Sequence, residues 1–136
     1  MLLANVTCVS VGGRCLLVEG PPGSGKSTLA LALIDRGGVL VGDDGVTLEV
    51  REGRLWATPP PNIAGKLEVR GVGIVEMDTA EAPLALILTL DPDAPRMPEP
   101  SSRKLLDHEI PAIPFRPGDA AQAMRAELAL EHFELL

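Results

Sequence analysis

The stretch GPPGSGKST, residues 20–28, has the residue types and the spacing of a phosphate-binding loop. Gly20, Gly25, Lys26 and Ser27 meet the pattern G-x-x-x-x-G-K-[ST]. In such a loop the backbone N–H groups surround phosphate oxygens, the lysine reaches the β- and γ-phosphates, and the hydroxyl binds Mg²⁺. We therefore predict an ATP and Mg²⁺ site whose nucleotide contacts come from Gly20, Pro21, Pro22, Gly23, Ser24, Gly25, Lys26, Ser27 and Thr28.

Two adjacent carboxylates, Asp43 and Asp44, follow the short apolar run that begins at Val39. Phosphoryl transfer needs a group that orients or deprotonates the acceptor and a carboxylate that helps to hold the metal. We expect this run to be a strand beside the strand that enters the loop, so that both acids lie at the edge where phosphates bind. Adjacent strand residues face opposite sides, so one acid would face the γ-phosphate and the other a metal-bound water or a backbone N–H. The alternative is a solvated turn.

Glu68 and Arg70 form a second pair of charged residues. They would share one face of an extended segment, because side chains alternate along a strand. A carboxylate that binds Mg²⁺ beside a guanidinium that contacts a phosphate would suit that face. An ordinary surface ion pair between them is an equal alternative.

The elements around these residues predict an α/β fold with a mixed sheet. A period-two run at 6–11 and an apolar run at 15–19 flank a Gly-Gly turn, which predicts a hairpin leading into the loop. A Leu- and Ala-rich helix is predicted over 27–37, and a second hairpin over 46–58. Because hairpins precede and follow the helix, we expect antiparallel pairs in the sheet.

The second half of the chain predicts fewer regular elements. Residues 58–66 contain three consecutive prolines and are expected to be a loop, and 67–77 is a segment broken by glycines. Residues 83–90 are expected to form a core strand, whereas 91–102 is too rich in proline for regular structure. Asp119 is predicted to cap a last helix. The apolar side of that helix is predicted at Met124, Leu128, Leu130 and Leu135.

Length and composition limit the classes of protein that this chain can belong to. Its 136 residues are enough for one compact core, so we predict a single domain over residues 1–136. The net charge of −7 argues against a nucleic-acid groove, and no apolar run is long enough to span a membrane. Cys8 and Cys15 have no partners at metal-ligand spacing, so we expect buried free thiols and a cytoplasmic location.

Three segments, GPPGSGKST, RGGVLVGDD and LEVRGVGI, together resemble the HPr kinase/phosphorylase family. The resemblance implies a P-loop-containing mixed sheet with flanking helices, similar to phosphoenolpyruvate carboxykinase, in the short form that has the C-terminal catalytic domain alone. It also implies an ATP- and Mg²⁺-dependent serine kinase that acts on the HPr-type phosphocarrier protein of the bacterial phosphotransferase system.

The resemblance further implies roles for individual residues. Asp44 would deprotonate the acceptor serine, with Asp43 as a supporting acid and Lys26 on the phosphates. Ser27 and Glu68 would bind Mg²⁺. Arg70 would contact a phosphate or the acceptor. Arg116, in IPFRPGDAA, matches a loop that in the family engages the acceptor or a neighbouring subunit, which implies a homo-oligomer, a hexamer.

Two positions depart from the family pattern. The family has a histidine where this chain has Asn5. The resemblance implies a kinase that also dephosphorylates its product by phosphorolysis, and Asn5 leaves this second activity open, because asparagine cannot carry a proton. Asp119 replaces the second arginine of the acceptor loop. The remaining alternatives are a P-loop kinase of a small metabolite and a nucleotide-sensing regulatory module.

Overall fold

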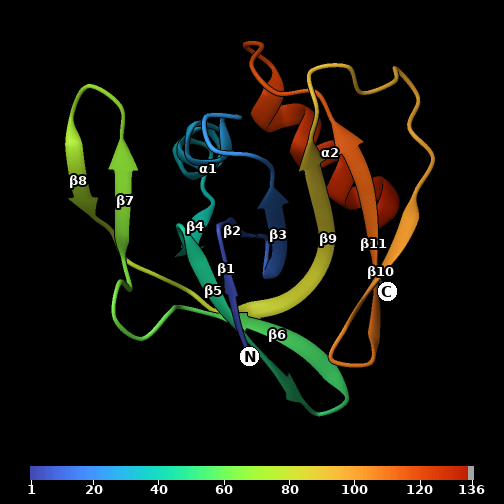
Figure 1. Cartoon of the computed structure of the whole chain (residues 1–136), viewed down its shortest axis with the longest axis horizontal. Helices are drawn as coiled ribbons and strands as arrows, with labels where there is room; N and C mark the ends of the chain where they lie inside the picture. The colour runs from blue at the N-terminus through green and yellow to red at the C-terminus, as the bar shows by residue number, and fades with distance from the viewer. Residues whose placement is uncertain (135–136) are drawn as a thin grey trace.

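Two helices lie over one face of a strongly curved mixed sheet in the computed structural model, which describes residues 1–134 (Figure 1). The helices are α1 (Lys26–Asp35) and α2 (Gln122–Phe133). The strands are β1 (Leu2–Ala4), β2 (Val6–Val11), β3 (Arg14–Glu19), β4 (Val39–Gly42), β5 (Gly45–Arg51), β6 (Arg54–Thr58), β7 (Lys66–Val69), β8 (Gly73–Glu76), β9 (Ala82–Leu90), β10 (Ser101–Leu105) and β11 (His108–Phe115). The two predicted hairpins are confirmed, because β2 pairs with β3 and β5 with β6, both antiparallel.

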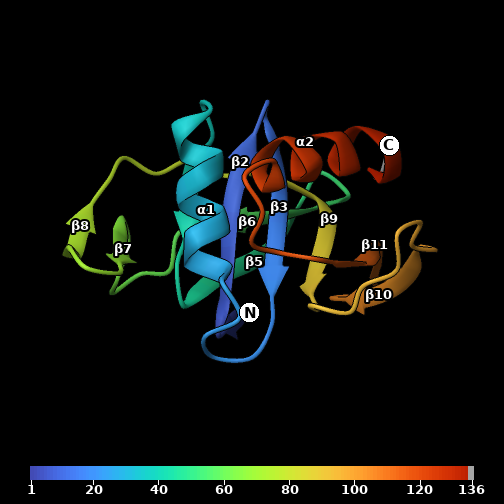
Figure 2. The ribbon, with the colours of Figure 1, turned by 90° about the horizontal axis from the view of Figure 1, so that it is seen from above.

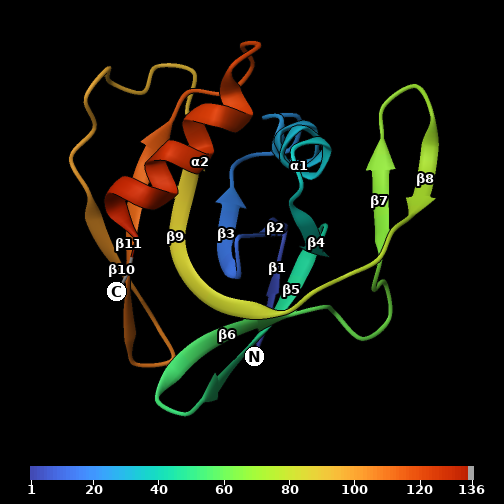
Figure 3. The same cartoon turned by 180° about the vertical axis from the view of Figure 1, so that it is seen from behind.

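The sheet is held together by β9, which two groups of strands share. The strand order is β1-β5-β6-β9-β3-β2-β4, and β11 pairs with both β9 and β10. β9 begins antiparallel to β6 and then runs parallel to β3 and β11. Its bend is the long arc in Figures 1 and 3, and it carries β5 and β6 to the side of the sheet away from the helices. The predicted mixture of parallel and antiparallel pairs is therefore confirmed.

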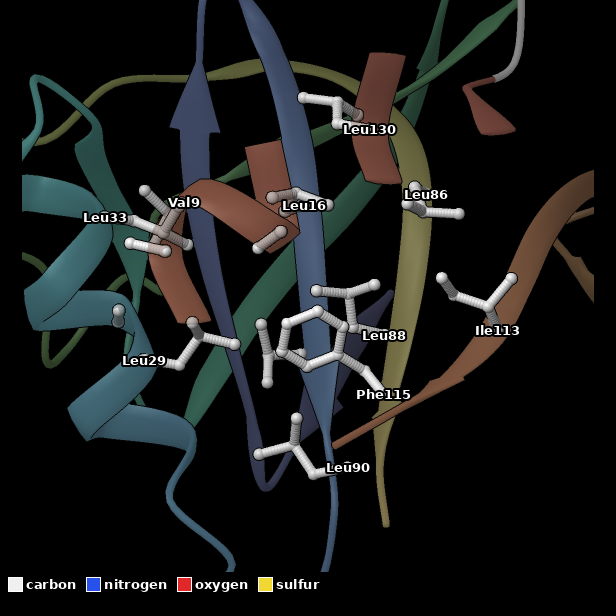
Figure 4. Packing of buried hydrophobic residues seen from close by; sticks show 14 of the residues in the cluster. Val9, Leu16, Leu29, Leu33, Leu86, Leu88, Leu90, Ile113, Phe115 and Leu130 are labelled. Carbon is white, nitrogen blue, oxygen red and sulfur yellow. The ribbon is translucent and has the colours of Figure 1, made fainter. Parts of the chain in front are cut away.

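Apolar side chains fill both faces of the central strands. Leu29 of α1 and Leu130 of α2 lie in one cluster with residues of β2, β3, β9 and β11 (Figure 4). A second cluster, on the opposite face, joins the central strands to β5 and β6. Leu86 and Leu88 belong to the helix-side cluster and Ile87 to the other, as strand alternation requires. Each buried leucine contributes about 1.5–3 kcal/mol, so both layers hold the central strands in place.

Helix α1 starts and stops close to the predicted positions. Its N-cap is Gly25, which makes no side-chain cap hydrogen bond, so the first N–H groups of the helix are not capped by that residue. At the other end, Gly37 has φ of 104° and donates to the Ile34 carbonyl at 3.0 Å, while Gly38 donates to the Leu33 carbonyl at 2.9 Å. This left-handed ending requires glycine, as the sequence predicts.

Helix α2 is present, but its cap and its apolar side differ from the prediction. The N-cap is Ala121, and Asp119 lies two residues too early; its carboxylate accepts a hydrogen bond from the Ala121 N–H at 2.9 Å. Met124 and Leu128 are 48% and 55% exposed, so their assignment to the buried side is wrong. Leu135 lies outside the described residues. The buried side is made of Gln122, Ala123, Ala126 and Leu130. Small alanines allow the helix to lie close to the sheet, which an apolar-size pattern does not predict.

The region before α2 contains a hairpin that the sequence patterns miss. Residues 91–100 lack regular structure, as expected, but β10 begins at Ser101 and pairs with β11. β11 contains Pro111 and Pro114, which cannot donate to a strand ladder and therefore hide the strand signal. The expectation for the cysteines is confirmed: Cys8 and Cys15 are buried free thiols, and burial raises the pKa of Cys8.

Candidate active site

The site lies at the edge of the sheet where several parallel strands end. β3 and β4 both run antiparallel to β2, so they point in the same direction, and β9 and β11 run parallel to β3. The phosphate-binding loop follows β3, and Asp43 and Asp44 follow β4. The expectation that β4 lies beside β3 is wrong, because β2 lies between them. The carboxyl-edge placement of both acids nevertheless holds, since strand direction alone determines it.

The phosphate-binding loop adopts a conformation that needs its glycines. Gly23 and Gly25 have φ of 79° and 104°, values that side chains with a Cβ rarely adopt. Lys26 Nζ donates to the carbonyl oxygens of Gly20 at 2.7 Å and Pro21 at 3.2 Å, so its ammonium group lies across the loop. Ser24 Oγ is buried and has no hydrogen-bond partner among the described residues. An anion held in the loop would meet a lysine, a hydroxyl and the start of α1, which fits a nucleotide phosphate.

The carboxylate of Asp43 is hydrogen-bonded to residues of β2, α1 and β7. It is 4% exposed. Its Oδ1 accepts hydrogen bonds from Thr7 Oγ1 at 2.9 Å and Ser27 Oγ at 2.8 Å, and its Oδ2 accepts one from the Glu68 N–H at 3.4 Å. Because Ser27 donates its single proton to Asp43, its lone pairs stay free to bind a cation.

Asp44 is exposed, although it is the very next residue. The two acids diverge because β4 ends at Gly42 and the chain bends, with Asp44 at φ of 61°, and not because of strand alternation. A Cβ at Gly42 would lie 2.1 Å from the Gly45 carbonyl oxygen, so only glycine permits this sharp bend. Asn5 lies beside it and donates its N–H to the Asp44 carbonyl at 3.0 Å.

A cavity of about 640 Å³ brings most of the predicted site residues together. One wall is the loop and the start of α1, with Lys26 and Ser27, and Asp44 also lines it. The opposite wall is the hairpin of β7 and β8, which stands apart from the main sheet (Figure 2). Glu68 and Arg70 line the cavity from this hairpin.

Glu68 and Arg70 both line the cavity, but they do not share one face of a single strand as expected. Glu68 lies in β7, but Arg70 lies in the turn that follows, where the Val72 N–H donates to the Val69 carbonyl at 3.0 Å. The alternative of an ion pair between them is not formed within residues 1–134. The fully buried Leu67 anchors the hairpin, and β7 contacts α1.

Arg116 does not lie in this cavity. It follows β11 and lines a second cavity of about 510 Å³ between the 91–100 segment and α2, together with Arg125 and Phe115. Its neighbour Pro117 does approach the phosphate-binding loop, since a Cβ at Gly25 would lie 3.9 Å from Pro117 Cβ. The acceptor role expected for Arg116 would therefore be exercised beside the loop and outside the main cavity.

Glu19, the last residue before the loop, forms an ion pair that the sequence patterns do not indicate. Arg103 of β10 donates to both of its carboxylate oxygens at 2.7 Å, and Thr89 Oγ1 donates to Oε2 at 2.7 Å. The Arg103 guanidinium, with help from Thr89, holds the pKa of the Glu19 carboxyl below its usual value. The pair neutralises an acid next to a loop whose glycines, lysine and helix start suit an anion.

The residues present fit Mg²⁺ better than a metal held by protein alone. No three Asp, Glu, His or Cys side chains within the described part of the chain are grouped as metal ligands. Mg²⁺ usually binds one or two protein oxygens together with substrate phosphates and waters. Ser27 Oγ and the Glu68 carboxylate, both facing the cavity, can supply such oxygens. No helix among residues 1–134 has the length and apolarity needed to cross a membrane.

Comparison with known proteins relates this arrangement to one family. The model of the HPr serine kinase C-terminal domain matches residues 3–80, more than half of the chain. The HPr kinase/phosphorylase of Clostridium tetani is 46% identical over 69 residues, which cover 51% of this chain and 23% of that protein. The HPr kinase/phosphorylase of Streptococcus thermophilus is 43% identical over 70 residues, which cover 51% of this chain and 23% of that protein. The matched part is thus about a quarter of these relatives' length.

A solved structure extends the similarity to almost the whole chain. The Hpr(Ser) kinase/phosphatase from Coxiella burnetii superposes with a TM-score of 0.83 and 25% identity, covering 97% of this chain and 90% of that chain. This match confirms the predicted fold class, including the strands and α2 beyond the segment that the family model covers.

Proposed function

The chain belongs to the family of HPr serine kinase C-terminal domains, and from this membership we propose that residues 1–136 form one catalytic domain that phosphorylates a serine of an HPr-type phosphocarrier protein with ATP and Mg²⁺. One observation carries the proposal: Lys26, Ser27, Asp44 and Glu68 line a single cavity. A sensing module would need the loop but would not need acids on two further segments at the same cavity.

In the proposed reaction, the chain binds the nucleotide with groups that are already near one another. Lys26 exchanges its bonds to the Gly20 and Pro21 carbonyls for bonds to phosphate oxygens, in which both the donor and the acceptor carry charge. The N–H groups at the start of α1 add to this anion site. Mg²⁺, held by Ser27 and Glu68, would neutralise charge on the phosphate oxygens. Arg70, from the opposite wall, contacts a phosphate or the acceptor.

We assign the base to Asp44 because the two acids differ in exposure. Asp44 is exposed at the cavity, so an acceptor serine can reach its carboxylate. Asp43 is buried, and Oδ1 already accepts two hydrogen bonds. The serine oxygen forms a bond to the γ-phosphorus, the bond to the β–γ bridging oxygen breaks, ADP leaves, and the serine proton passes to Asp44.

The reverse reaction is phosphorolysis of the phosphoserine, and for this reaction the chain has fewer proton-exchanging side chains than the family pattern. Asp44 would return the proton to the serine oxygen while inorganic phosphate attacks. Asn5 bonds to Asp44 through its backbone and has no titratable group, so it cannot share in proton exchange with Asp44. We propose that the kinase activity of this chain exceeds its phosphorylase activity. The family resemblance also implies a cytoplasmic homo-oligomer. In that assembly Arg116 would engage the acceptor or a neighbouring subunit.

The test is to incubate the purified protein with γ-labelled ATP, Mg²⁺ and the phosphocarrier protein of the same organism, and to measure intact masses. One added phosphate on a serine is expected, and a slower loss of that phosphate when ATP is removed and excess inorganic phosphate is added. An unmodified carrier despite bound ATP would reject the proposed acceptor and favour a metabolite kinase or a sensing module. Light scattering of the same sample tests the hexamer.

A further inference from the structure

The charge of Asp43 is held by hydrogen bonds and by no ion pair. Within the described residues, no lysine, arginine or histidine forms an ion pair with this carboxylate. Burial of a charge is costly unless donors replace the lost water. Two of its three donors are the hydroxyls of Thr7 and Ser27, and both bond to Oδ1. The direction in which Oδ1 points therefore depends on both hydroxyls.

Thr7 reaches Asp43 because its strand lies between the two strands that carry the site. β2 separates β3, which enters the phosphate-binding loop, from β4, which ends before Asp43. Thr7 pairs with Val18 of β3, and the next residue, Cys8, pairs with Gly42 of β4. Thr7 is fully buried and does not line the cavity, so it can affect a ligand only through its neighbours.

The hydroxyl of Thr7 has no role in apolar packing. Its neighbours in β2, Val6, Cys8 and Val9, are buried apolar residues, and valine has nearly the same shape as threonine. A valine would avoid the cost of burying a hydroxyl, so the hydroxyl is explained by its bond to Asp43.

We infer that Thr7 is a positioning residue: its hydroxyl fixes the Asp43 carboxylate, which in turn fixes the proton of Ser27 and turns the lone pairs of Ser27 Oγ toward a bound cation. The inference rests on the proposed function, in which Ser27 binds Mg²⁺. Outer hydrogen bonds of this kind orient the groups that bind a metal directly. Without the Thr7 hydroxyl, Asp43 Oδ1 keeps Ser27 as its one hydroxyl donor. The Asp43 carboxylate and the Ser27 hydroxyl can then rotate together.

Two substitutions separate the hydroxyl from the shape of the side chain. Thr7→Val removes the hydroxyl and keeps the shape, whereas Thr7→Ser keeps the hydroxyl and removes a methyl group. Thr58→Val is the matched control, because Thr58 is buried and donates to the Thr47 carbonyl at 3.4 Å on the β5–β6 pair, outside the cavity lining. Calorimetric titration with ADP at a series of Mg²⁺ concentrations measures binding without turnover.

Thr7→Val is expected to raise the Mg²⁺ concentration for half-maximal ADP binding by about tenfold, the usual size of such outer-bond losses. Thr7→Ser and Thr58→Val should stay near the wild-type value. In a Ser27→Ala background, Thr7→Val should cause no additional change, because the effect passes through Ser27. If Thr7→Val does not fold, Thr7→Ala, which also lacks the hydroxyl, replaces it at a temperature where both it and Thr7→Ser are folded.

Three results would overturn the inference. The first is a wild-type Mg²⁺ requirement in the variant that lacks the Thr7 hydroxyl. The second is a Mg²⁺ requirement raised equally in Thr7→Ser, which would indicate that packing is the cause. The third is a further rise in the Mg²⁺ requirement when Thr7→Val is added to Ser27→Ala. Failure of the proposed nucleotide and Mg²⁺ site gives a different result, since wild-type protein itself would then show no Mg²⁺-dependent ADP binding. Failure of the proposed acceptor alone is seen in the carrier assay and leaves this titration unchanged.

Discussion

Replacing the two adjacent acids one at a time by asparagine separates their roles. Asn keeps the size of the side chain and is one of the few residues that tolerate the φ of 61° found at Asp44. Asp44→Asn should therefore fold normally and bind MgATP as the wild type does. It cannot accept the serine proton, so the phosphoryl-transfer rate should fall by about 10²–10⁴-fold, or roughly 2.7–5.4 kcal/mol in the barrier.

Asp43→Asn should instead reduce stability. The amide group has one accepting oxygen in place of two, so its NH₂ would face either the Thr7 and Ser27 hydroxyls or the Glu68 N–H, all of which are donors to Asp43. A buried unpaired donor costs about 1–3 kcal/mol. For a chain of this size that corresponds to a decrease in Tm of about 4–12 °C, whereas Asp44→Asn should change the unfolding free energy by less than about 0.5 kcal/mol.

The assay combines thermal denaturation, calorimetric MgATP binding and single-turnover transfer to the phosphocarrier protein. The expected pattern is a rate defect without a stability defect for Asp44→Asn, and a stability defect with a raised Mg²⁺ requirement for nucleotide binding for Asp43→Asn. The assignment of the base is refuted if Asp44→Asn transfers phosphate at the wild-type rate. It is also refuted if Asp44→Asn loses MgATP binding as much as it loses rate, since the acid would then hold the metal.

Three further predictions test the loop, the bend and the flanking ion pair. Lys26→Ala should lose about 1.5–3 kcal/mol of MgATP binding free energy, as expected for a hydrogen bond to a charged group, and should abolish turnover; calorimetry and labelled-phosphate transfer measure both. Gly42→Ala should destabilise the chain, since its Cβ would meet the Gly45 carbonyl oxygen at 2.1 Å; an unchanged Tm would contradict that close approach. The lowered pKa of Glu19 means that its ion pair with Arg103 stabilises the fold above the unfolded-state pKa of about 4.3 and that this contribution is lost as the pH falls through the folded-state pKa. Arg103→Gln should therefore lower stability near pH 7 by at most about 1 kcal/mol, because the pair is partly screened by solvent, and unfolding curves of variant and wild type should converge at acidic pH.

The elements that the sequence predicts well are those whose signals are local. The phosphate-binding loop, the helix that ends at Gly37 and the two hairpins depend on glycine positions and on short-range alternation, and each was expected near its observed place. The direction of β4 could also be inferred, because an acid at its end had to lie near the phosphates. Its neighbour could not, because the insertion of β2 between β3 and β4 is decided by long-range pairing.

The parts that could not be predicted depend on contacts between distant segments. Thr7 and Asp43 are far apart in the sequence, and the hydrogen bond from the Thr7 hydroxyl to Asp43 follows from the strand order. Arg103 and Glu19 meet because β11 pairs with β9 and brings β10 along. Thr7 is one of two polar residues in β2, the other being Ser10, so the strand itself does not single it out, and prolines concealed β11.

Asp43 also explains how a wall that stands apart from the sheet can take part in the site. The β7–β8 hairpin is a separate sheet, and the buried Leu67 and the bond from the Glu68 N–H to Asp43 help to join it to the edge where the cavity lies. The same carboxylate accepts a hydrogen bond from Ser27 Oγ at the start of α1. Both proposed Mg²⁺ ligands, Ser27 and Glu68, are thus tied to one buried group. Thr7 and Ser27 share Oδ1 of this carboxylate, whereas the Glu68 backbone bonds to Oδ2, so the hydroxyl on β2 bears on the Ser27 side of the cavity although Thr7 does not line it.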